Sequence, residues 1–356
     1  MSSTPSVTPR WLTAGLTRVF AAAGLADRAA ATVAEALVDA DLRGIPSHGA
    51  MLTPMYVDRL RRGSVTTAER AEVVVDAGAV AVLDAGHAMG VLTGDQAMAL
   101  AVAKAHELGA GAVVVRRAFH FGAAARFARA AALDGCIGIA AANTRPLMPA
   151  PGGAQPVVGN NPLAIGVPRA GGEPVVLDMA LSEAALGKIR LAAQEGREIP
   201  PTWATDADGR PTTDPEAAVA GMLLPAAGHK GYGLALMIDV LTGVLSGGAF
   251  GAAVQGLYAD TATPNDCAHC FLALDPARFG LAPDAFASRA EELFAQVTGG
   301  RRAPGVERLL LPGQLEAERH REASASGVAV DRSVLEALER TAAELGVELP
   351  PKEVSQ

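Results

Sequence analysis

The spacing of apolar residues changes twice along the chain, and this change constrains the fold more than any other feature. Over residues 11–42 apolar side chains recur at helical spacing, with a break near Gly24 that predicts two helices. A third helical stretch ends at Arg61-Arg62-Gly63, since cations followed by glycine are typical of a helix C-terminus. The spacing over residues 331–345 predicts a last amphipathic helix. We expect Asp331 to cap its start and Pro350-Pro351 to stop it.

Between these helical ends the chain alternates between short valine-rich runs and longer alanine-rich segments. The valine-rich runs predict strands, and the alanine-rich segments with helical spacing predict helices. We expect strands at residues 71–75, 79–83, 112–115, 137–141, 163–167, 175–178 and 271–274. We expect helices at about residues 94–108, 122–133, 181–195 and 230–245. The middle of the chain is therefore mixed α and β.

Composition excludes several classes of protein. The chain has 356 residues, enough for about two domains, and half of them are hydrophobic. Its 30 basic and 38 acidic side chains leave a net charge of −8, which argues against a nucleic-acid partner. The apolar runs are shorter than the roughly 20 residues of a membrane span, so we expect no membrane partner. Three cysteines and a polar start without a signal-peptide pattern favour a cytoplasmic location.

Neither of the two common phosphate-binding motifs is present. A dinucleotide fingerprint needs Gly-x-Gly-x-x-Gly between a strand and a helix, and a P-loop needs Gly-x-x-x-x-Gly-Lys-Ser/Thr. Gly109-Ala-Gly111 precedes a predicted strand instead of following one, and Gly228-His-Lys-Gly-Tyr-Gly233 has the wrong spacing. A nucleotide bound by this chain must therefore be held by a fold other than the Rossmann fold.

One segment looks like half of a zinc site. Cys267-Ala-His269-Cys270 offers three possible ligands, but a structural zinc needs four and the remaining cysteine is far away at position 136. We therefore favour small side chains that pack on a strand, and we expect no metal.

Three histidines lie beside glycines at predicted element boundaries. His48 ends Asp41-Leu-Arg-Gly-Ile-Pro-Ser-His48, His120 precedes Phe121-Gly122, and His229 precedes the last central helix. Taken singly, each histidine is explained as well by a surface or a buried structural role. Together they favour a shared site, because glycine allows a ligand to approach the backbone and helix N-termini attract phosphate. An imidazole at such a turn suits proton transfer near neutral pH.

Seven motifs in order resemble one family of enzymes. They are Asp41-Leu-Arg-Gly-x-x-Ser47-His48-Gly49, His120-Phe-Gly-Ala-Ala124, Pro151-Gly-Gly153 with Gly159-Asn-Asn-Pro162, Val176-Leu-Asp-Met179, Gly187-Lys188, Gly228-His-Lys-Gly-Tyr-Gly233 and Phe271-Leu-Ala-Leu-Asp275. From about Leu12 to Leu349 the chain resembles the malate/L-lactate dehydrogenase family, whose members lack a Rossmann fold. That family also contains sulfolactate, ureidoglycolate and diketogulonate oxidoreductases and the Δ1-piperideine-2-carboxylate reductases.

The resemblance implies an α+β fold in which both chain ends build one helical domain, with a central mixed-sheet domain that binds the cofactor. On this basis residues 1–70 and 315–356 form the helical domain, and residues 71–314 form the central one. It also implies a homodimer that binds NAD or NADP near the subunit interface, together with a small-molecule substrate.

The same resemblance assigns roles to individual residues. His48 is the proton donor and Ser47 its hydrogen-bonding partner, while Asn160 lies on the substrate side. The residues that match cofactor contacts are His120, Phe121, Gly122, Asp178, Leu186, Gly187, Lys188, His229, Lys230, Pro312, Gly313 and Gln314. In the implied reaction a hydride moves between nicotinamide and a substrate carbon, and His48 supplies the proton that the developing oxyanion needs.

This chain departs from the family pattern at position 52. Many members carry an arginine there, four residues after the catalytic histidine, and its planar fork grips the substrate carboxylate. Leu52 cannot do so. Either the substrate lacks that carboxylate or presents a bulkier apolar group, or another cation replaces the arginine, for which Arg145 is the candidate. The simpler interpretation of Arg145 is a surface turn residue capped by Asn143.

Two further positions bear on the substrate and the cofactor. Members that reduce imines have an acidic residue at position 188. This chain has Lys188 there, as do the members that reduce keto acids. Ala118-Phe119 replaces polar residues before His120. We therefore expect an NAD(P)-dependent oxidoreductase of a small 2-oxo acid or related ketone in specialised metabolism. The alternatives are a cyclic imine reductase and a non-catalytic relative that binds the cofactor.

Overall fold

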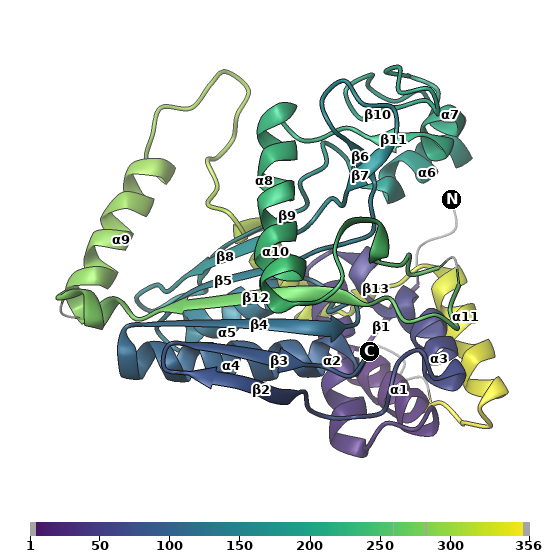
Figure 1. Cartoon of the computed structure of the whole chain (residues 1–356), viewed down its shortest axis with the longest axis horizontal. Helices are drawn as coiled ribbons and strands as arrows, with labels where there is room; N and C mark the ends of the chain where they lie inside the picture. The colour runs from purple at the N-terminus through teal and green to yellow at the C-terminus, as the bar shows by residue number, and fades with distance from the viewer. Residues whose placement is uncertain (1–4, 259, 282, 352–356) are drawn as a thin grey trace.

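A mixed sheet of seven strands runs through the middle of the molecule (Figure 1), which is a computed structural model that describes residues 5–258, 260–281 and 283–351. Across the sheet the order is β2 (Glu72–Ala77), β3 (Val80–Asp84), β4 (Ala110–Ala118), β12 (Cys267–Leu274), β5 (Ile137–Ala142), β8 (Leu163–Val167) and β9 (Val175–Met179). β3 and β4 are parallel, and the other neighbours are antiparallel. The strands predicted from the valine-rich runs are all confirmed.

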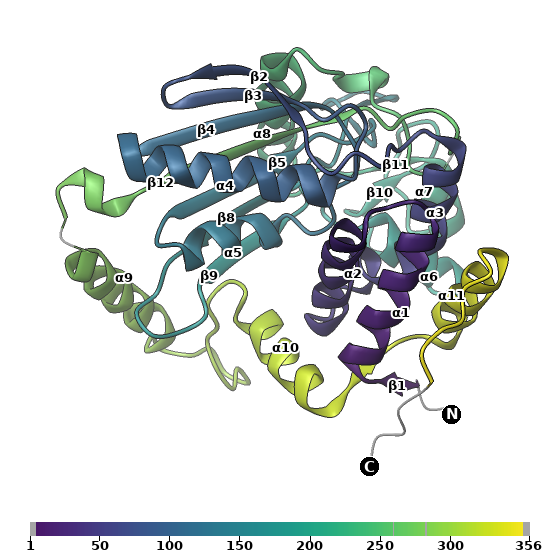
Figure 2. The same ribbon diagram turned by 90° about the horizontal axis from the view of Figure 1, so that it is seen from below.

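Two alanine-rich helices, α4 (Gly90–Leu108) and α5 (Ala125–Leu133), cover one face of the sheet (Figure 2). They approach it closely, because a Cβ at Gly111 would lie 2.0 Å from the carbonyl oxygen of Ala101 and one at Gly166 would lie 2.2 Å from that of Ala128. Only glycine fits such contacts. The opposite face carries α8 (His229–Asp239), which continues into a π-helical turn, Val240–Val244.

Helices from both chain ends share one hydrophobic core. α1 (Pro9–Ala22), α2 (Asp27–Leu42) and α3 (Thr53–Arg62) pack with α11 (Arg332–Glu344), and the two-residue strands β1 (Ser6–Val7) and β13 (Val328–Ala329) pair beside them. The buried side chains include Leu12, Phe20, Leu37, Tyr56 and Leu338. The predicted fold class is therefore confirmed. The domain boundaries at residues 70 and 315 stay a prediction, and residues 1–4 and 352–356 of that division lie outside the described residues.

A smaller unit with its own core lies beyond the sheet edge formed by β9. It contains β6 (Met148–Pro149), β7 (Pro156–Val158), α6 (Leu186–Gln194), β10 (Ala204–Thr205), α7 (Pro215–Ala220) and β11 (Met222–Leu223). Its core holds Met148, Val158, Ile189, Leu223 and Ile238. This core attaches α6 to the segment that follows β5, which matters for the site below.

Some predicted boundaries are wrong, each for a reason found in the tertiary structure. The helix predicted from residue 181 begins at Leu186, because residues 181–183 pair with residues 224–226. α11 ends at Glu344, well before Pro350-Pro351, since Gly346 adopts a left-handed conformation with φ +68°. Asp331 occupies the N-cap position of α11, but its side chain makes no capping hydrogen bond. Helices α9 (Pro283–Thr298) and α10 (Gln314–Ser326) were not predicted.

Candidate active site

Two histidines predicted to share a site lie against each other. His48 ends a 3₁₀ turn, Pro46–His48, and His120 follows β4; their rings stack with centroids 5.6 Å apart and planes 21° apart. Ser47 Oγ lies 3.0 Å from His48 Nδ1, within hydrogen-bonding distance. The structure therefore brings together the pair that the sequence assigned to proton transfer and to cofactor binding.

A buried tyrosine, Tyr56 of α3, fixes the second histidine. Its Oη lies 2.7 Å from His120 Nδ1. Burial raises the pKa of Tyr56, so the hydroxyl keeps its proton and donates it. Burial, with smaller effects of His48 and His269, lowers the pKa of His120 to about 3. A neutral His120 that accepts at Nδ1 carries its proton on Nε2, so Tyr56 sets its tautomer.

The loop that carries His48 is held by Asp41, the first residue of its motif. Asp41 Oδ2 accepts a hydrogen bond of 2.8 Å from the backbone N–H of Ala50. A Cβ at Gly49 would lie 1.9 Å from Asp41 Oδ1, so only glycine allows this packing. Burial raises the pKa of Asp41 to about 7. Sequence reasoning quoted Asp41 and missed both its role and that of Tyr56.

Hydrogen bonds connect the histidine turn to the predicted cofactor residues. The backbone N–H of Ala125, at the start of α5, donates to Asp178 Oδ2 at 2.8 Å. Two residues earlier on β9, the N–H of Val176 donates to the carbonyl of Pro312 at 3.2 Å. A Cβ at Gly313 would lie 2.7 Å from the carbonyl oxygen of Val176. Asp178 and the Pro312-Gly313 segment therefore lie next to the turn that follows His120.

Asp178 titrates far above an ordinary aspartate. Although its side chain reaches solvent, surrounding protein atoms raise its pKa to about 6, and the negative charge of Glu316 adds to this effect. The hydrogen bond from Ala125 opposes the shift. Gln314 turns back toward its own helix, where Oε1 accepts from the N–H of Leu311 and Nε2 donates to Glu318.

Residues 181–183, before α6, pair antiparallel with residues 224–226, before α8. The N–H of Glu183 donates to Leu224 at 2.8 Å, and the N–H of Ala226 donates to Leu181 at 2.9 Å. Five predicted cofactor residues lie at the starts of these two helices: Leu186, Gly187, Lys188, His229 and Lys230.

These residues fit the phosphates of a dinucleotide. Neither α6 nor α8 has a side-chain N-cap, so their first backbone N–H groups are available to an anion. Lys188 and Lys230 are exposed beside them. Gly122, Gly187 and Gly228 have open space where a Cβ would be, which leaves the backbone accessible.

Asn160 and Arg145, the two polar residues predicted on the substrate side, are joined through Thr144. Thr144 Oγ1 donates to Asn160 Oδ1 at 3.0 Å, and the carbonyl of Asn160 accepts from the N–H of Leu181 at 2.8 Å. Arg145 is exposed, and no described acidic side chain pairs with it. Asn143 does not cap this turn with its side chain, which is buried and bonded to Asp239, Ala249 and Ala268.

Two predicted site residues point into hydrophobic cores instead. Leu52 is 2% exposed and belongs to the helical core, where an aliphatic side chain is favoured over contact with water, so it does not line open space. Phe121 is also 2% exposed, and its ring stacks on His269 at 4.5 Å and on Phe127 at 4.9 Å. Its backbone alone is left to contact a cofactor.

The segment that resembled half of a zinc site is the start of β12. Cys267 and His269 are buried, with Sγ and Nε2 3.4 Å apart, and burial lowers the pKa of His269 to about 3. The predicted strand is confirmed. Among the described residues no group of three or more potential metal ligands comes together.

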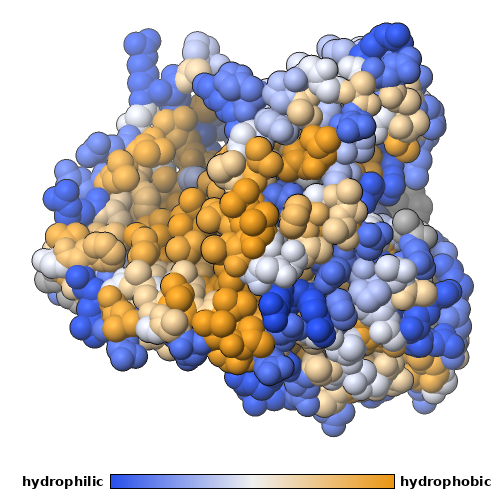
Figure 3. Space-filling view, viewed as in Figure 1, coloured by the Kyte–Doolittle hydropathy of each residue, from blue (hydrophilic) through white to orange (hydrophobic). Residues whose placement is uncertain are grey.

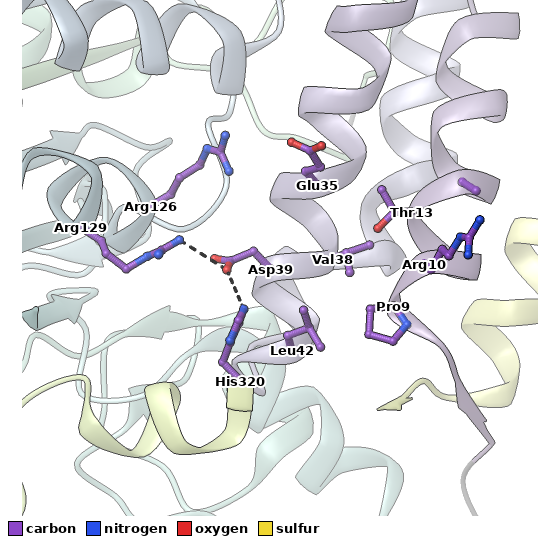
Figure 4. Close-up of a pocket in the computed structure, with 11 residues that line it drawn as sticks. Pro9, Arg10, Thr13, Glu35, Val38, Asp39, Leu42, Arg126, Arg129 and His320 are labelled. Atoms are coloured by element: carbon purple, nitrogen blue, oxygen red, sulfur yellow. Dashed lines mark hydrogen bonds and ion pairs between the residues drawn. The ribbon is translucent and has the colours of Figure 1, made fainter. Parts of the chain in front are cut away.

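A cavity of about 600 Å³ lies away from all of these residues, between α1, α2, α5 and α10 (Figure 4). We call it the Asp39 groove; it is lined by Pro9, Arg10, Thr13, Ala14, Glu35, Val38, Asp39, Leu42, Arg126, Arg129 and His320. Asp39 lies 3.5 Å from Arg129 and 3.4 Å from His320. Neither His48 nor His120 lines this groove.

No helix within the described part of the chain is long and apolar enough to cross a membrane.

Comparisons with known proteins agree with this geometry. Residues 7–339 match the family described as malate/L-lactate dehydrogenase. The chain is 38% identical over 325 residues to L-sulfolactate dehydrogenase of Methanothermobacter thermautotrophicus, covering 90% of this chain and 92% of the relative. It is 37% identical over 308 residues to ureidoglycolate dehydrogenase (NAD(+)) of Escherichia coli K12, covering 86% and 87%. The solved sulfolactate dehydrogenase of Methanocaldococcus jannaschii superposes with a TM-score of 0.91 at 33% identity, covering 97% of this chain and 98% of the other.

Proposed function

Because the chain belongs to the malate/L-lactate dehydrogenase family, we propose that it interconverts a small 2-oxo acid and its 2-hydroxy acid, with His48 as the proton donor and acceptor. The family consists of NAD(P)-dependent 2-hydroxy acid dehydrogenases, so the chain is an oxidoreductase that uses NAD or NADP. The observation that carries the proposed role of His48 is the stacking of its ring on His120. The turn after His120 leads to Ala125, whose N–H is bonded to the predicted cofactor residue Asp178.

The cofactor supplies or removes the hydride when it is bound. Lys188, Lys230 and the N-termini of α6 and α8 would hold its phosphates, and the open backbone at Gly122 would allow close approach. His48 transfers a proton to the substrate oxygen as the hydride reaches the carbon, and it recovers that proton from solvent. In the oxidative direction the same imidazole removes the hydroxyl proton, so atoms and charges balance both ways.

Burial lowers the pKa of His48, so the free enzyme holds this imidazole largely neutral at pH 7. A neutral imidazole is ready to accept the hydroxyl proton of a 2-hydroxy acid. For reduction, the negative charge of a bound substrate raises the pKa of His48 and favours its protonated form. Ser47 orients the ring by bonding to Nδ1, and this leaves Nε2 to exchange the proton.

We also propose that the chain acts as a homodimer. One face of the molecule carries a continuous apolar surface over α8 and its π-helical turn (Figure 3). Its exposed side chains are Leu234, Leu236, Met237, Val240, Leu241, Val244, Leu245 and Phe250. Such a surface supports burial against a second copy. Sedimentation would find a dimer, and Met237→Asp would convert it to a monomer. The cytoplasmic location and the place in specialised metabolism stay predictions.

The test is to mix the purified protein with NADH or with NADPH and follow loss of absorbance of the reduced nicotinamide. The panel contains 2-oxo acids, α-diketones and cyclic imines. Turnover of 2-oxo acids supports the proposal. Preference for Δ1-piperideine-2-carboxylate over pyruvate and oxaloacetate would support imine reduction instead. Cofactor binding without turnover of any compound would support a non-catalytic relative.

A further inference from the structure

We propose that Asp239, the last residue of α8, is a positioning residue for hydride transfer. Through Asn143 it holds the turn of residues 143–145 against the helix that begins with the predicted cofactor residues His229 and Lys230. Hydride transfer needs the two reacting carbons at a fixed separation, so the spacing between this turn and α8 affects the rate of that step. The inference rests on the proposed function and adds residues that position its site.

The amide of Asn143 is buried and uses both of its hydrogens. Nδ2 donates to Asp239 Oδ1 and to the carbonyl of Ala249, at 2.9 Å in each case, and Oδ1 accepts from the N–H of Ala268 at 2.7 Å. Only one orientation of the amide offers an oxygen to Ala268 and a nitrogen to the other two partners. Asn143 therefore joins β12 to α8 and to the segment that follows the π-helical turn.

A second buried amide, that of Asn161, joins the same turn to α8. Its Oδ1 accepts from the N–H of Thr144 at 2.9 Å, and its Nδ2 donates to the carbonyl of Ala235 at 2.8 Å. Ala235 and Asp239 are four residues apart, so they lie on one face of α8 in successive helical turns. Two contacts at different heights fix the orientation of the turn of residues 143–145 as well as its distance from the helix.

The turn in turn holds Asn160, which we expect on the substrate side. Thr144 Oγ1 donates to Asn160 Oδ1 at 3.0 Å. A Cβ at Gly159 would lie 2.2 Å from Thr144 Oγ1 and 2.3 Å from Asn161 Oδ1, so only glycine allows this close packing. A displacement of Thr144 would therefore move the amide of Asn160 relative to α8.

The π-helical turn after Asp239 leaves room for the amide of Asn143. A Cβ at Gly243, within that turn, would lie 2.8 Å from Asn143 Nδ2 and 2.4 Å from the carbonyl oxygen of Ala249. Only glycine allows the turn to pass so close to both groups. π-Helical turns within α-helices are frequent at functional sites, and this one accommodates the contact that joins Asn143 to α8.

Asp239 is buried with two neutral donors as its hydrogen-bonding partners. Besides the bond from Asn143, its Oδ2 accepts from the N–H of Gly251 at 3.2 Å, and no described basic side chain forms an ion pair with it. Burial raises the pKa of Asp239, and the two hydrogen bonds oppose this shift. A buried carboxylate without a cation costs stability that an apolar side chain would not cost. We therefore assign to Asp239 the placement of an acceptor for Asn143.

The experiment measures hydride transfer in a single turnover. The enzyme, in excess over NADH, is mixed rapidly with a saturating concentration of the 2-oxo acid that the panel above identifies as the best substrate. Asp239→Ala should lower the rate constant about tenfold to a hundredfold, because small misplacements of the reacting carbons slow the chemical step. Loss of folded protein would lower the amplitude and leave the rate constant unchanged. The Kd for NADH should not change, since pairing of residues 181–183 with residues 224–226 holds the start of α8 independently.

Two further variants separate positioning from stability. Asp239→Asn keeps an oxygen for Asn143 and should recover most of the rate. Thr242→Val is the matched control, because Thr242 is buried in the next turn but its hydroxyl bonds only to the carbonyls of Ile238 and Asp239 in its own helix. Its rate constant should equal that of the wild type, whatever its melting temperature. If Asp239→Ala does not fold, Asp239→Leu takes its place, since leucine fills the space without offering an acceptor.

Hydrogen–deuterium exchange tests the positioning without turnover. In Asp239→Ala the segment of residues 143–147 should exchange faster than in the wild type, while β10 and β11 should not change. If this occurs but no 2-oxo acid is turned over, the proposed function fails and the link between α8 and the turn stands. If 2-oxo acids are turned over and Asp239→Ala matches the wild type in rate constant and in exchange, the inference is wrong and the proposed function stands.

Discussion

Arginines cluster in two regions of this molecule, and the clusters differ in how their charges are balanced. In the Asp39 groove (Figure 4) Asp39 lies 3.5 Å from Arg129 and 3.4 Å from His320. The same carboxylate lies 2.9 Å from Arg43, so two arginines and a histidine converge on it. Neither Arg145 nor Arg190, by contrast, forms an ion pair with any acid of the described residues. A charge balanced within the chain stabilises the fold, whereas a charge left unbalanced is available to a ligand.

The groups around Asp39 also come from three separate helices. Asp39 belongs to α2, Arg129 to α5 and His320 to α10, so this one carboxylate joins the helical core to the sheet and to the segment that carries Pro312 and Gly313. The lesson is that a cavity lined by charged side chains does not by itself identify a catalytic site. The groove has a volume of about 600 Å³, yet its charges are used to hold helices together.

The strongest test of this comparison is His48→Ala. We expect kcat to fall about 10² to 10⁴-fold, because the substrate oxygen loses its proton donor. Cofactor affinity, followed by fluorescence of the bound nicotinamide, should stay the same, and so should the melting temperature. Equal losses of affinity and stability would mean that this imidazole has a structural role.

Leu52→Arg tests whether position 52 belongs to the core or to the substrate. Because Leu52 is packed in the helical core, a buried guanidinium without an acid should reduce the free energy of unfolding by about 3–5 kcal/mol. Urea denaturation measures this loss, with Leu52→Met as a volume-matched control that should cost less than about 1.5 kcal/mol. A stable variant that turned over simple 2-oxo acids faster would show that this position faces the substrate after all.

Asp39→Ala tests the groove. Removing the shared carboxylate leaves Arg43 and Arg129 without their partner, so we expect about 1–3 kcal/mol less stability and unchanged KM values. Glu336→Ala, which removes an exposed carboxylate from α11, should change stability by no more than about 0.5 kcal/mol. Thermal melting and steady-state kinetics together provide the comparison. A large change in KM with normal stability would assign the groove to ligand binding.

The last test concerns the pH dependence of stability in Asp41→Asn, a change in the loop that carries His48. The folded state raises the pKa of Asp41 from 3.8 to about 7, so the charged carboxylate disfavours folding, and wild-type stability falls as pH rises through this window. Asparagine keeps an acceptor for the N–H of Ala50 without the charge. The variant should therefore gain stability at about pH 8, and the gain should shrink by about pH 5. A loss of equal size at both values would contradict this sign.

Much of the fold could be predicted from local pattern. Helices α1 and α2 and the strands of the central sheet follow from spacing that needs no partner to be recognised. Helices α9 and α10 were missed, and the start of α6 was misplaced, because pairing of residues 181–183 with residues 224–226 overrides the helical pattern there. Such pairing depends on residues about 40 positions away, which no local window contains.

The candidate site was predicted less evenly. The motifs led to His48, His120 and Asp178; ring stacking joins the two histidines, and a hydrogen bond joins Asp178 to the start of α5. They did not lead to Tyr56, because a tyrosine at helical spacing is indistinguishable from a core residue. They also placed Leu52 and Phe121 at the site, whereas both side chains pack into cores.

The sequence by itself determined the family and the class of fold, because ordered motifs and apolar periodicity are local properties of the chain. Only the tertiary structure decided which charges are already balanced. An arginine has the same side chain at positions 129, 145 and 190, and whether an acid lies within reach depends on how distant helices pack. The leucine at position 52 was therefore visible in the sequence, while its burial in the helical core was visible only after folding.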